Sequence, residues 1–217
     1  MTKKENDIKA IIWDIGGVIY LAKDKSKRKS KNLHTSISEL WILLNGVDIN
    51  NTEMLKQFKE IYFKSSGGEL SKEETLNSLS RVLNIPLEKV DKIIYDAIKK
   101  NTVVNKFIIK LILKLKNEGY KHGILSIQWS MSNDILVKED YYSLFDEMVI
   151  SCIDKVRKPS LDSFKLILKK MNLSAEQAIF VDDNQENIDA AKSLGIKTVL
   201  FIDNNKLKKE FAELGVK

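Results

Sequence analysis

The chain opens with a short apolar run that stops at a polar residue. Residues 8–13 (IKAIIW) are mostly apolar and rich in β-branched side chains, and they are followed by Asp14, Gly16 and Gly17. This pattern is typical of a buried strand that leads into a tight loop. It predicts a strand over 8–13 with Asp14 at its C-terminal end.

Residues 33–100 have a different pattern, with apolar side chains at helical spacing. Four segments show it: residues 36–46, 51–65, 71–85 and 86–100. Ser71 with Glu74 fits a capping box, and Pro86 suits the first turn of a helix. The SSGG sequence at 65–68 is a natural break. We therefore expect four helices that form a separate lobe.

After residue 101, helical and strand-like patterns alternate. Strands are predicted over 121–126, 147–151, 177–182 and 197–202, and helices over 103–118, 131–138, 160–172, 185–194 and from about 204 onward. Strands separated by helices indicate a parallel sheet with helices on both faces. The predicted fold class is α/β, with a Rossmann-like core and a small helical lobe inserted after the first strand.

The composition is that of a folded protein, with 217 residues of which 43% are hydrophobic. No apolar run approaches the roughly 20 residues of a membrane span, and the first ten residues lack the apolar stretch of a signal peptide. We expect a cytoplasmic protein without a membrane partner. The net charge of +6 includes one concentrated basic run, residues 23–31, without interleaved aromatics. We interpret that run as a solvated loop, with a phosphate-attracting rim as the alternative, and expect no nucleic-acid partner.

Polar residues lie at or shortly beyond the ends of four predicted strands. They are Asp14, Ser126, Lys158 and the pair Asp182 and Asp183. In a parallel sheet such strand ends converge on one pocket. Three carboxylates brought together repel one another and need a cation, and their hard oxygens suit Mg²⁺. The alternative is that the acidic pair only forms a turn and an N-cap before the next helix, but a cap needs a single carboxylate.

The same residues suit phosphoryl transfer. A lysine ammonium and a serine hydroxyl, at Lys158 and Ser126, would meet the charge of a phosphoryl group. The ionised carboxylate of Asp14 would attack phosphorus and give an aspartyl-phosphate that water later hydrolyses. The predicted substrate is a small phosphorylated metabolite, and the oligomeric state is expected to be monomer or homodimer.

The order of these motifs resembles the haloacid dehalogenase (HAD) superfamily. The motifs are DxGGV at 14–18, a serine after an apolar strand, KP at 158–159 and VDDNxxNIxAAxxLGI at 181–196. The resemblance covers about residues 8–203. It implies a HAD core of residues 1–20 and 101–217, and a C1-type helical cap over 21–100.

The resemblance also implies roles for individual residues. The implied metal ligands for Mg²⁺ are Asp14, the Gly16 carbonyl, Asp182 and Asp183. The implied catalytic residues are Asp14, Ser126 and Lys158, and the implied substrate-binding residues are Ser126, Lys158 and Gly17. Asn187 matches a position that supports the last loop, with an exposed polar residue as the alternative. The implied activity is that of a Mg²⁺-dependent phosphatase.

The chain departs from the family pattern at two positions. Gly16 stands where most of the phosphatases carry a second aspartate as general acid and base, a group worth about 10² to 10⁴ in rate. Ile127 stands where asparagine is common after the serine. We interpret Gln128 as an ordinary loop residue, with a replacement amide as the alternative. We expect His34 to be exposed, with a substitute acid as the alternative.

Two other functions fit this family pattern. A 2-haloacid dehalogenase, in which the aspartate attacks carbon, needs neither metal nor an acid at position 16, but the pair Asp182 and Asp183 argues against it. A non-catalytic protein that binds a ligand or partner is favoured by Gly16 and Ile127.

Overall fold

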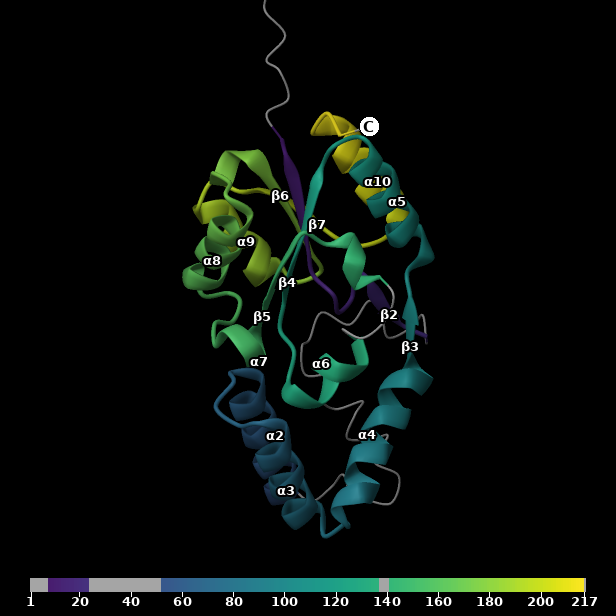
Figure 1. The fold of residues 1–217 in the computed structure, drawn as a ribbon, viewed down its shortest axis with the longest axis vertical. Helices are drawn as coiled ribbons and strands as arrows, with labels where there is room; N and C mark the ends of the chain where they lie inside the picture. The colour runs from purple at the N-terminus through teal and green to yellow at the C-terminus, as the bar shows by residue number, and fades with distance from the viewer. Residues whose placement is uncertain (1–7, 24–51, 137–140, 217) are drawn as a thin grey trace, which may run out of the picture.

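A five-stranded parallel sheet forms the centre of the protein (Figure 1). The computed structural model describes residues 8–23, 52–136 and 141–216. Across the sheet the strands are β5 (Glu147–Ile150), β4 (Lys121–Ser126), β1 (Ala10–Trp13), β6 (Ala178–Asp182) and β7 (Lys197–Leu200). All neighbouring pairs in it are parallel. The α/β, Rossmann-like prediction is confirmed.

Helices cover both faces of this sheet. One face carries α5 (Lys106–Asn117) and α10 (Asn204–Glu213), and the other carries α8 (Leu161–Met171) and α9 (Gln185–Ser193) (Figure 1). Successive β1 side chains alternate between the two apolar clusters: Ile11 and Trp13 pack on the α5 side, and Ile12 packs on the α8 side. Because each strand is buried on both faces, its sequence is continuously apolar rather than alternating.

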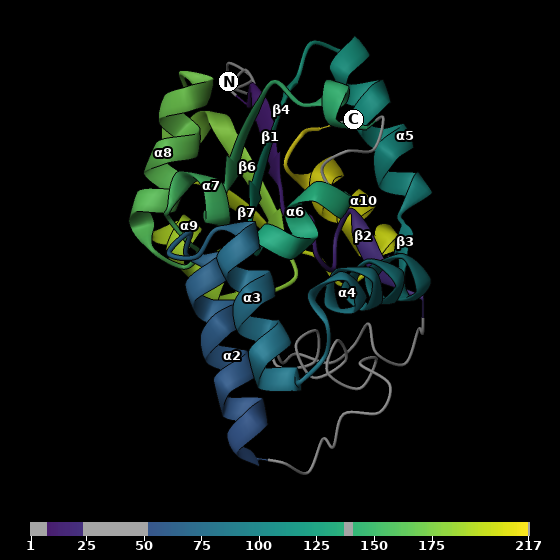
Figure 2. The same ribbon diagram turned by 60° about the horizontal axis from the view of Figure 1, so that its bottom comes forward.

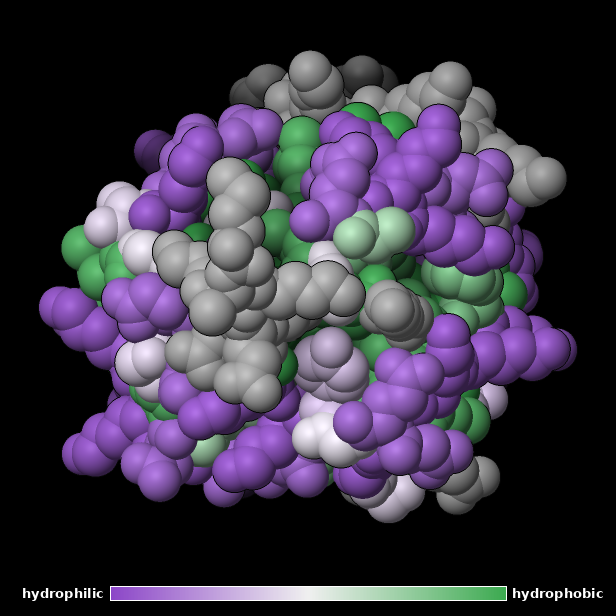
Figure 3. Space-filling model, turned by 90° about the horizontal axis from the view of Figure 1, so that it is seen from above, coloured by the Kyte–Doolittle hydropathy of each residue, from purple (hydrophilic) through white to green (hydrophobic). Residues whose placement is uncertain are grey.

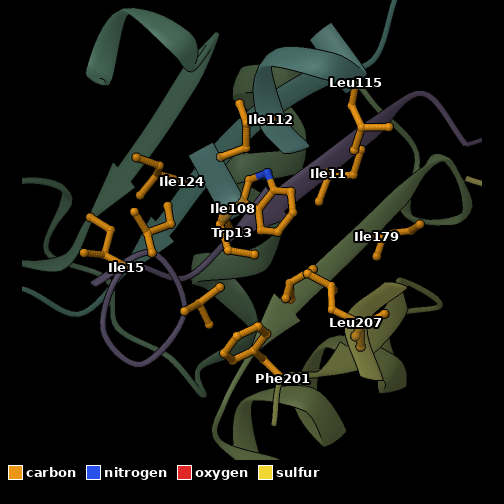
Figure 4. Close-up of a cluster of buried hydrophobic side chains, with 14 of the residues drawn as sticks. Ile11, Trp13, Ile15, Ile108, Ile112, Leu115, Ile124, Ile179, Phe201 and Leu207 are labelled. Atoms are coloured by element: carbon orange, nitrogen blue, oxygen red, sulfur yellow. The ribbon is translucent and has the colours of Figure 1, made fainter. Parts of the chain in front are cut away.

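Trp13 lies at the centre of the α5-side cluster, surrounded by aliphatic side chains from several elements (Figure 4). A buried indole N–H needs an acceptor. It donates to Nδ1 of His122 on β4, at 3.1 Å. The other ring nitrogen of His122, Nε2, is buried without a hydrogen-bond partner. His122 is therefore held as a neutral imidazole inside the core.

Burial of His122 makes the fold sensitive to acid. Removal from water lowers the pKa of His122 from 6.5 to about 4. Between these values the unfolded chain binds a proton that the folded chain does not, so the free energy of unfolding falls as pH drops from 6.5 toward 4. The expected contribution is on the order of 3 kcal/mol. Denaturant titrations at several pH values should show a shallower decline for His122→Gln, and equal declines in the two proteins would contradict this expectation.

The helical lobe consists of α2 (Thr52–Ser66), α3 (Lys72–Leu83) and α4 (Leu87–Asn101). It has its own apolar cluster, which includes Phe58, Leu79 and Ile94 together with Trp129 and Met131 from the segment after β4. The lobe therefore packs on α6 (Ser130–Leu136), as Figures 1 and 2 show. The helix predicted over 36–46 and residues 24–31 of the basic run lie outside the described residues.

The ends of the lobe helices follow the sequence signals closely. The capping box of Ser71 and Glu74 is present at the start of α3. Pro86 is the N-cap of α4, one residue before the predicted position. A proline fits here because the first N–H groups of a helix have no partner within it.

A two-stranded antiparallel ribbon, absent from the sequence prediction, lies between the sheet and the lobe (Figure 2). It pairs β2 (Tyr20–Ala22) with β3 (Thr102–Val104). The helix predicted from residue 103 therefore begins only at Lys106. The predicted boundaries of the core and lobe, at residues 20 and 101, fall at the start of β2 and at the end of α4, directly before β3, and they stay a prediction.

Three short helical segments complete the described structure. They are α7 (Ser151–Asp154) and the 3₁₀ turns η2 (Tyr142–Leu144) and η3 (Ala175–Gln177). Ser151, predicted as the end of a strand, instead begins α7. Hydrophilic side chains make up most of the visible surface at the end of the molecule that Figure 3 shows. Within the described ranges, no helix is both long and apolar enough to cross a membrane.

Candidate active site

Two aspartates lie side by side where β1 and β6 end. The strands are paired in parallel with Trp13 opposite Val181, so Asp14 and Asp182 are the next residues on each. The Asp14 N–H donates to the Val181 carbonyl at 2.9 Å, which fixes the start of its loop. One carboxylate oxygen from each of Asp14, Asp182 and Asp183 lies within 4.8 Å of the other two. The structure thus brings together the three carboxylates singled out from the sequence.

Lys158 joins this cluster from the loop between α7 and α8. Its Nζ lies 2.8 Å from Oδ1 of Asp14 and 2.5 Å from Oδ2 of Asp182. The side chain is only 2% exposed, and a buried ammonium is stable only when it is paired. Burial lowers the pKa of Lys158, but the two carboxylates outweigh that effect and raise its pKa overall. Lys158 is therefore a fixed positive charge beside Asp14.

One ammonium does not balance three carboxylates. Burial raises the pKa of Asp14 to about 6, against the attraction of Lys158, and the charge of Asp182 adds to the rise. Removal from water raises the pKa of Asp183 to about 7, followed by repulsion from Asp14 and Asp182. Asp183 is the exposed member of the three carboxylates.

The donor set fits a divalent metal ion. Three carboxylates less one ammonium leave two uncompensated negative charges at one strand edge. Oxygen ligands of this kind suit Mg²⁺, which commonly uses one or two protein carboxylates together with substrate oxygens and water. The cluster Asp14, Asp182 and Asp183 is thus a candidate Mg²⁺ site. The backbone carbonyl of Gly16 as a further ligand stays a prediction.

Two asparagines form hydrogen bonds that hold the loop after β6 in place. Asn187 Nδ2 donates to both oxygens of Asp182, each at 3.1 Å, and the backbone N–H of Asn184 donates to Oδ1 at 2.8 Å. Asn187 is buried, so the alternative of an exposed polar residue is wrong for it. The N-cap of α9 is Asn184, whose side chain accepts from the Glu186 N–H. Asp182 and Asp183 are therefore not needed as N-caps of α9.

The two glycines after Asp14 have different surroundings. Gly17 has a φ of 79°, and a Cβ there would overlap with the Asp183 carboxylate. Its N–H donates to the Tyr20 carbonyl at 2.8 Å. Gly17 therefore makes room for Asp183, and its predicted contact with substrate stays a prediction. A Cβ on Gly16 would meet no other atom within 4 Å, so a side chain would fit there.

Ser126 is the last residue of β4 and is buried at the same edge of the sheet. Its hydroxyl accepts a hydrogen bond from Nε2 of Gln128, at 3.0 Å. The Gln128 amide also accepts from the Ser132 hydroxyl at 2.6 Å, and its backbone N–H donates to the Ser151 hydroxyl at 3.0 Å. Interpreting Gln128 as an ordinary loop residue was wrong. Its spacing of two from Ser126 was the available signal, because alternate residues of an extended chain point the same way.

The comparison with known proteins decides the family. Residues 27–201 match the family model described as haloacid dehalogenase-like hydrolase. The chain belongs to this family. The matched residues begin after Asp14 and Gly16, so the roles of those two residues in this HAD-like hydrolase rest on the strand pairing and contacts described above.

Curated relatives of this HAD-like hydrolase include phosphatases. A sesquiterpene phosphatase from Aspergillus oryzae is 23% identical over 192 residues, which is 87% of each chain. A glyceraldehyde 3-phosphate phosphatase from Pyrococcus furiosus is 36% identical over 98 residues, 42% of this chain and 39% of the relative. A drimenol cyclase from Aspergillus calidoustus is 26% identical over 71% of this chain and 30% of the relative. The chain thus matches less than half the length of the last two relatives.

Solved structures share the fold. A HAD family enzyme from Bacteroides thetaiotaomicron, in complex with magnesium and inorganic phosphate, has a TM-score of 0.69 and 19% identity, covering 88% of this chain and 93% of that one. An L-2-haloacid dehalogenase from Xanthobacter autotrophicus has a TM-score of 0.56 and 18% identity, covering 97% of this chain and 84% of that one. At such identities these likenesses concern the fold of this HAD-like hydrolase alone.

Proposed function

We propose that this HAD-like hydrolase is a Mg²⁺-dependent phosphatase that acts on small phosphate monoesters through an aspartyl-phosphate at Asp14. The observation that carries the proposal is the cluster of Asp14, Asp182 and Asp183 with Lys158 bonded to two of them. A site with an excess of negative charge attracts a divalent cation. A phosphoryl group bound there would then have the cation on one side and the Lys158 ammonium on the other. Phosphatase relatives support the proposal.

Each site residue has a distinct part in the proposed reaction. Asp14 supplies the oxygen that attacks phosphorus, and β1 fixes its backbone. Lys158 lies next to that oxygen and meets the charge of the phosphoryl oxygens, with the Ser126 hydroxyl as a further donor. When bound, Mg²⁺ would supply charge neutralisation, held by the three carboxylates. Water then releases phosphate and restores Asp14.

Metal dependence tests the proposal directly. We expect release of inorganic phosphate from a panel of alkyl and aryl phosphates with Mg²⁺, and its loss when a chelator removes the metal. Restoring Mg²⁺ should restore the rate, which separates metal removal from unfolding. Phosphate release that a chelator leaves unchanged would contradict the proposal. Binding of Mg²⁺ and phosphate without turnover on the whole panel would favour a ligand-binding protein instead.

A second candidate is 2-haloacid dehalogenation. Gly16 favours it, because attack of a carboxylate on carbon releases halide without an acid at that position. The three clustered carboxylates count against it, since they would repel an anionic haloacid unless a cation were present. Chloride release from 2-chloropropionate in the presence of a chelator would favour dehalogenation over the phosphatase proposal.

A further inference from the structure

A buried amide lies beside the Ser126 hydroxyl. Gln128 is only 4% exposed, and its side chain forms hydrogen bonds at both ends. Its Nε2 lies 3.0 Å from Oγ of Ser126, and its Oε1 lies 2.6 Å from Oγ of Ser132. Each end of the amide therefore faces one serine hydroxyl.

The two distances show which end of the amide suits Ser126. A serine hydroxyl can donate or accept, so each serine by itself would tolerate either end. Hydrogen bonds between two oxygens are typically about 2.7 Å long, and those from an N–H to an oxygen about 2.9 to 3.0 Å. The contact of 2.6 Å with Ser132 thus suits the amide oxygen, and the contact of 3.0 Å with Ser126 suits the amide nitrogen. Gln128 is therefore the donor to Ser126.

The backbone around Gln128 is held from two sides. Ser151, the first residue of α7, accepts from the Gln128 N–H at 3.0 Å and donates to the Gln128 carbonyl at 3.1 Å. Two residues further on, the Ser130 N–H donates to the hydroxyl of Ser65, and the Ser130 hydroxyl donates to that of Thr75, each at 3.1 Å. The core and the lobe both fix this segment, so the Gln128 amide keeps its orientation.

This hydrogen bond restricts where the Ser126 proton can point. A hydroxyl has one proton and two acceptor positions, and an amide N–H can only donate. The bond from Gln128 therefore occupies an acceptor position of Ser126 and turns the proton away from the amide. Within the part of the chain that the structure describes, Gln128 is the one hydrogen-bond partner of the Ser126 hydroxyl. The Ser126 proton stays available to another acceptor.

We propose that Gln128 is a positioning residue that keeps Ser126 as a hydrogen-bond donor to the phosphoryl group. This inference rests on the proposed phosphatase function. β4 lies next to β1, so Ser126 ends its strand at the same edge of the sheet as Asp14. A hydroxyl that accepts one hydrogen bond donates a stronger one, because neighbouring bonds polarise each other. Gln128 acts through Ser126 and needs no contact with the substrate.

A double-mutant cycle tests this role. The variants are Gln128→Met, Ser126→Ala and both together, compared by kcat/KM for 4-nitrophenyl phosphate at saturating Mg²⁺. Methionine has nearly the length of glutamine without its hydrogen bonds, so Gln128→Met should lower kcat/KM by about 10- to 100-fold, the range for a hydrogen bond to a charged group. Added to Ser126→Ala, it should cost less than about 2-fold more, because no hydroxyl is left to position.

Gln57→Met is the matched control. Gln57 is an exposed residue of α2, so the same chemical change there should leave kcat/KM at the parent value. Thermal unfolding of every variant separates a loss of folding from a loss of positioning.

Gln128→Glu tests the direction of the hydrogen bond and is taken through the same cycle. Its carboxylate can still accept from Ser132, but it would also accept the Ser126 proton. The hydroxyl would then present only lone pairs to the phosphoryl oxygens. We expect kcat/KM to fall further than in Gln128→Met, although glutamate has the shape of glutamine.

Three results would overturn the positioning role. They are an equal loss from Gln128→Met with and without the Ser126 hydroxyl, no loss from Gln128→Met, and a smaller loss from Gln128→Glu than from Gln128→Met. Each would leave the phosphatase proposal in place, because the parent releases phosphate in the same assay. Absence of phosphate release from the parent on every substrate would refute both proposals.

Discussion

Asp14→Asn is expected to abolish phosphate release, with a loss of at least about 10⁴-fold in kcat. The amide has nearly the shape of the carboxylate, but its oxygen carries no full charge and attacks phosphorus poorly. It also removes one partner of Lys158 and one of the three clustered carboxylates. The measurement is steady-state phosphate release at saturating Mg²⁺, for the variant and the parent in parallel.

Asp162→Asn is the matched control for this variant. Asp162 lies in the first turn of α8 with a side chain that is 74% exposed, so the same chemical change there should leave kcat unaltered. Thermal unfolding should show that both variants are folded. Retention of more than a small fraction of the parent activity by Asp14→Asn would exclude Asp14 as the nucleophile.

Gly16→Asp is expected to raise turnover of alkyl phosphates by about 10²-fold, the lower end of what a positioned acid and base group contributes. The site has room for the side chain, since a Cβ on Gly16 meets no other atom within 4 Å. A carboxyl group at this position would give a proton to the leaving oxygen and take one from the attacking water. The gain should be smaller for 4-nitrophenyl phosphate.

Gly16→Asn is the control for that gain. Its amide occupies similar space without a transferable proton, so it should leave kcat near the parent value. An equal gain from both variants would attribute the effect to packing of the loop. No gain from Gly16→Asp would indicate that proton transfer to the leaving group does not limit the rate.

The sheet and the convergence of the site were predictable from local sequence. The apolar runs before Asp14, Ser126 and Asp182 each end where a strand ends, and a parallel sheet places those ends on one edge. The position of Lys158 was harder to predict, because this residue belongs to a loop and reaches the edge of the sheet only through its long side chain. Its proximity to the aspartates was expected from the motif order rather than from periodicity.

Features that depend on distant pairing were missed. β2 and β3 have three residues each and are separated by about eighty residues of sequence, so neither has enough periodicity to be recognised. The contacts between the lobe and the segments next to Ser126 and Lys158 were equally hidden. Helical spacing shows that α2 has an apolar face, but it does not show that Tyr62 faces Trp129 or that Phe63 meets Arg157.

His34, considered from the sequence as a substitute acid, lies outside the described residues. Gln128 was underestimated for a different reason. A polar residue after a strand is ordinarily solvated, and only the hydroxyls of Ser126, Ser132 and Ser151 around it explain its burial.

The fit of Gly17 against Asp183 joins the first and last site loops into one packing unit. Neither loop is free to change alone. A larger residue at position 17 would displace the carboxylate and would also be strained by the positive φ of that position. The loop after β6 can therefore be moved into another scaffold, or exchanged between relatives, only together with Gly17 from the loop after β1.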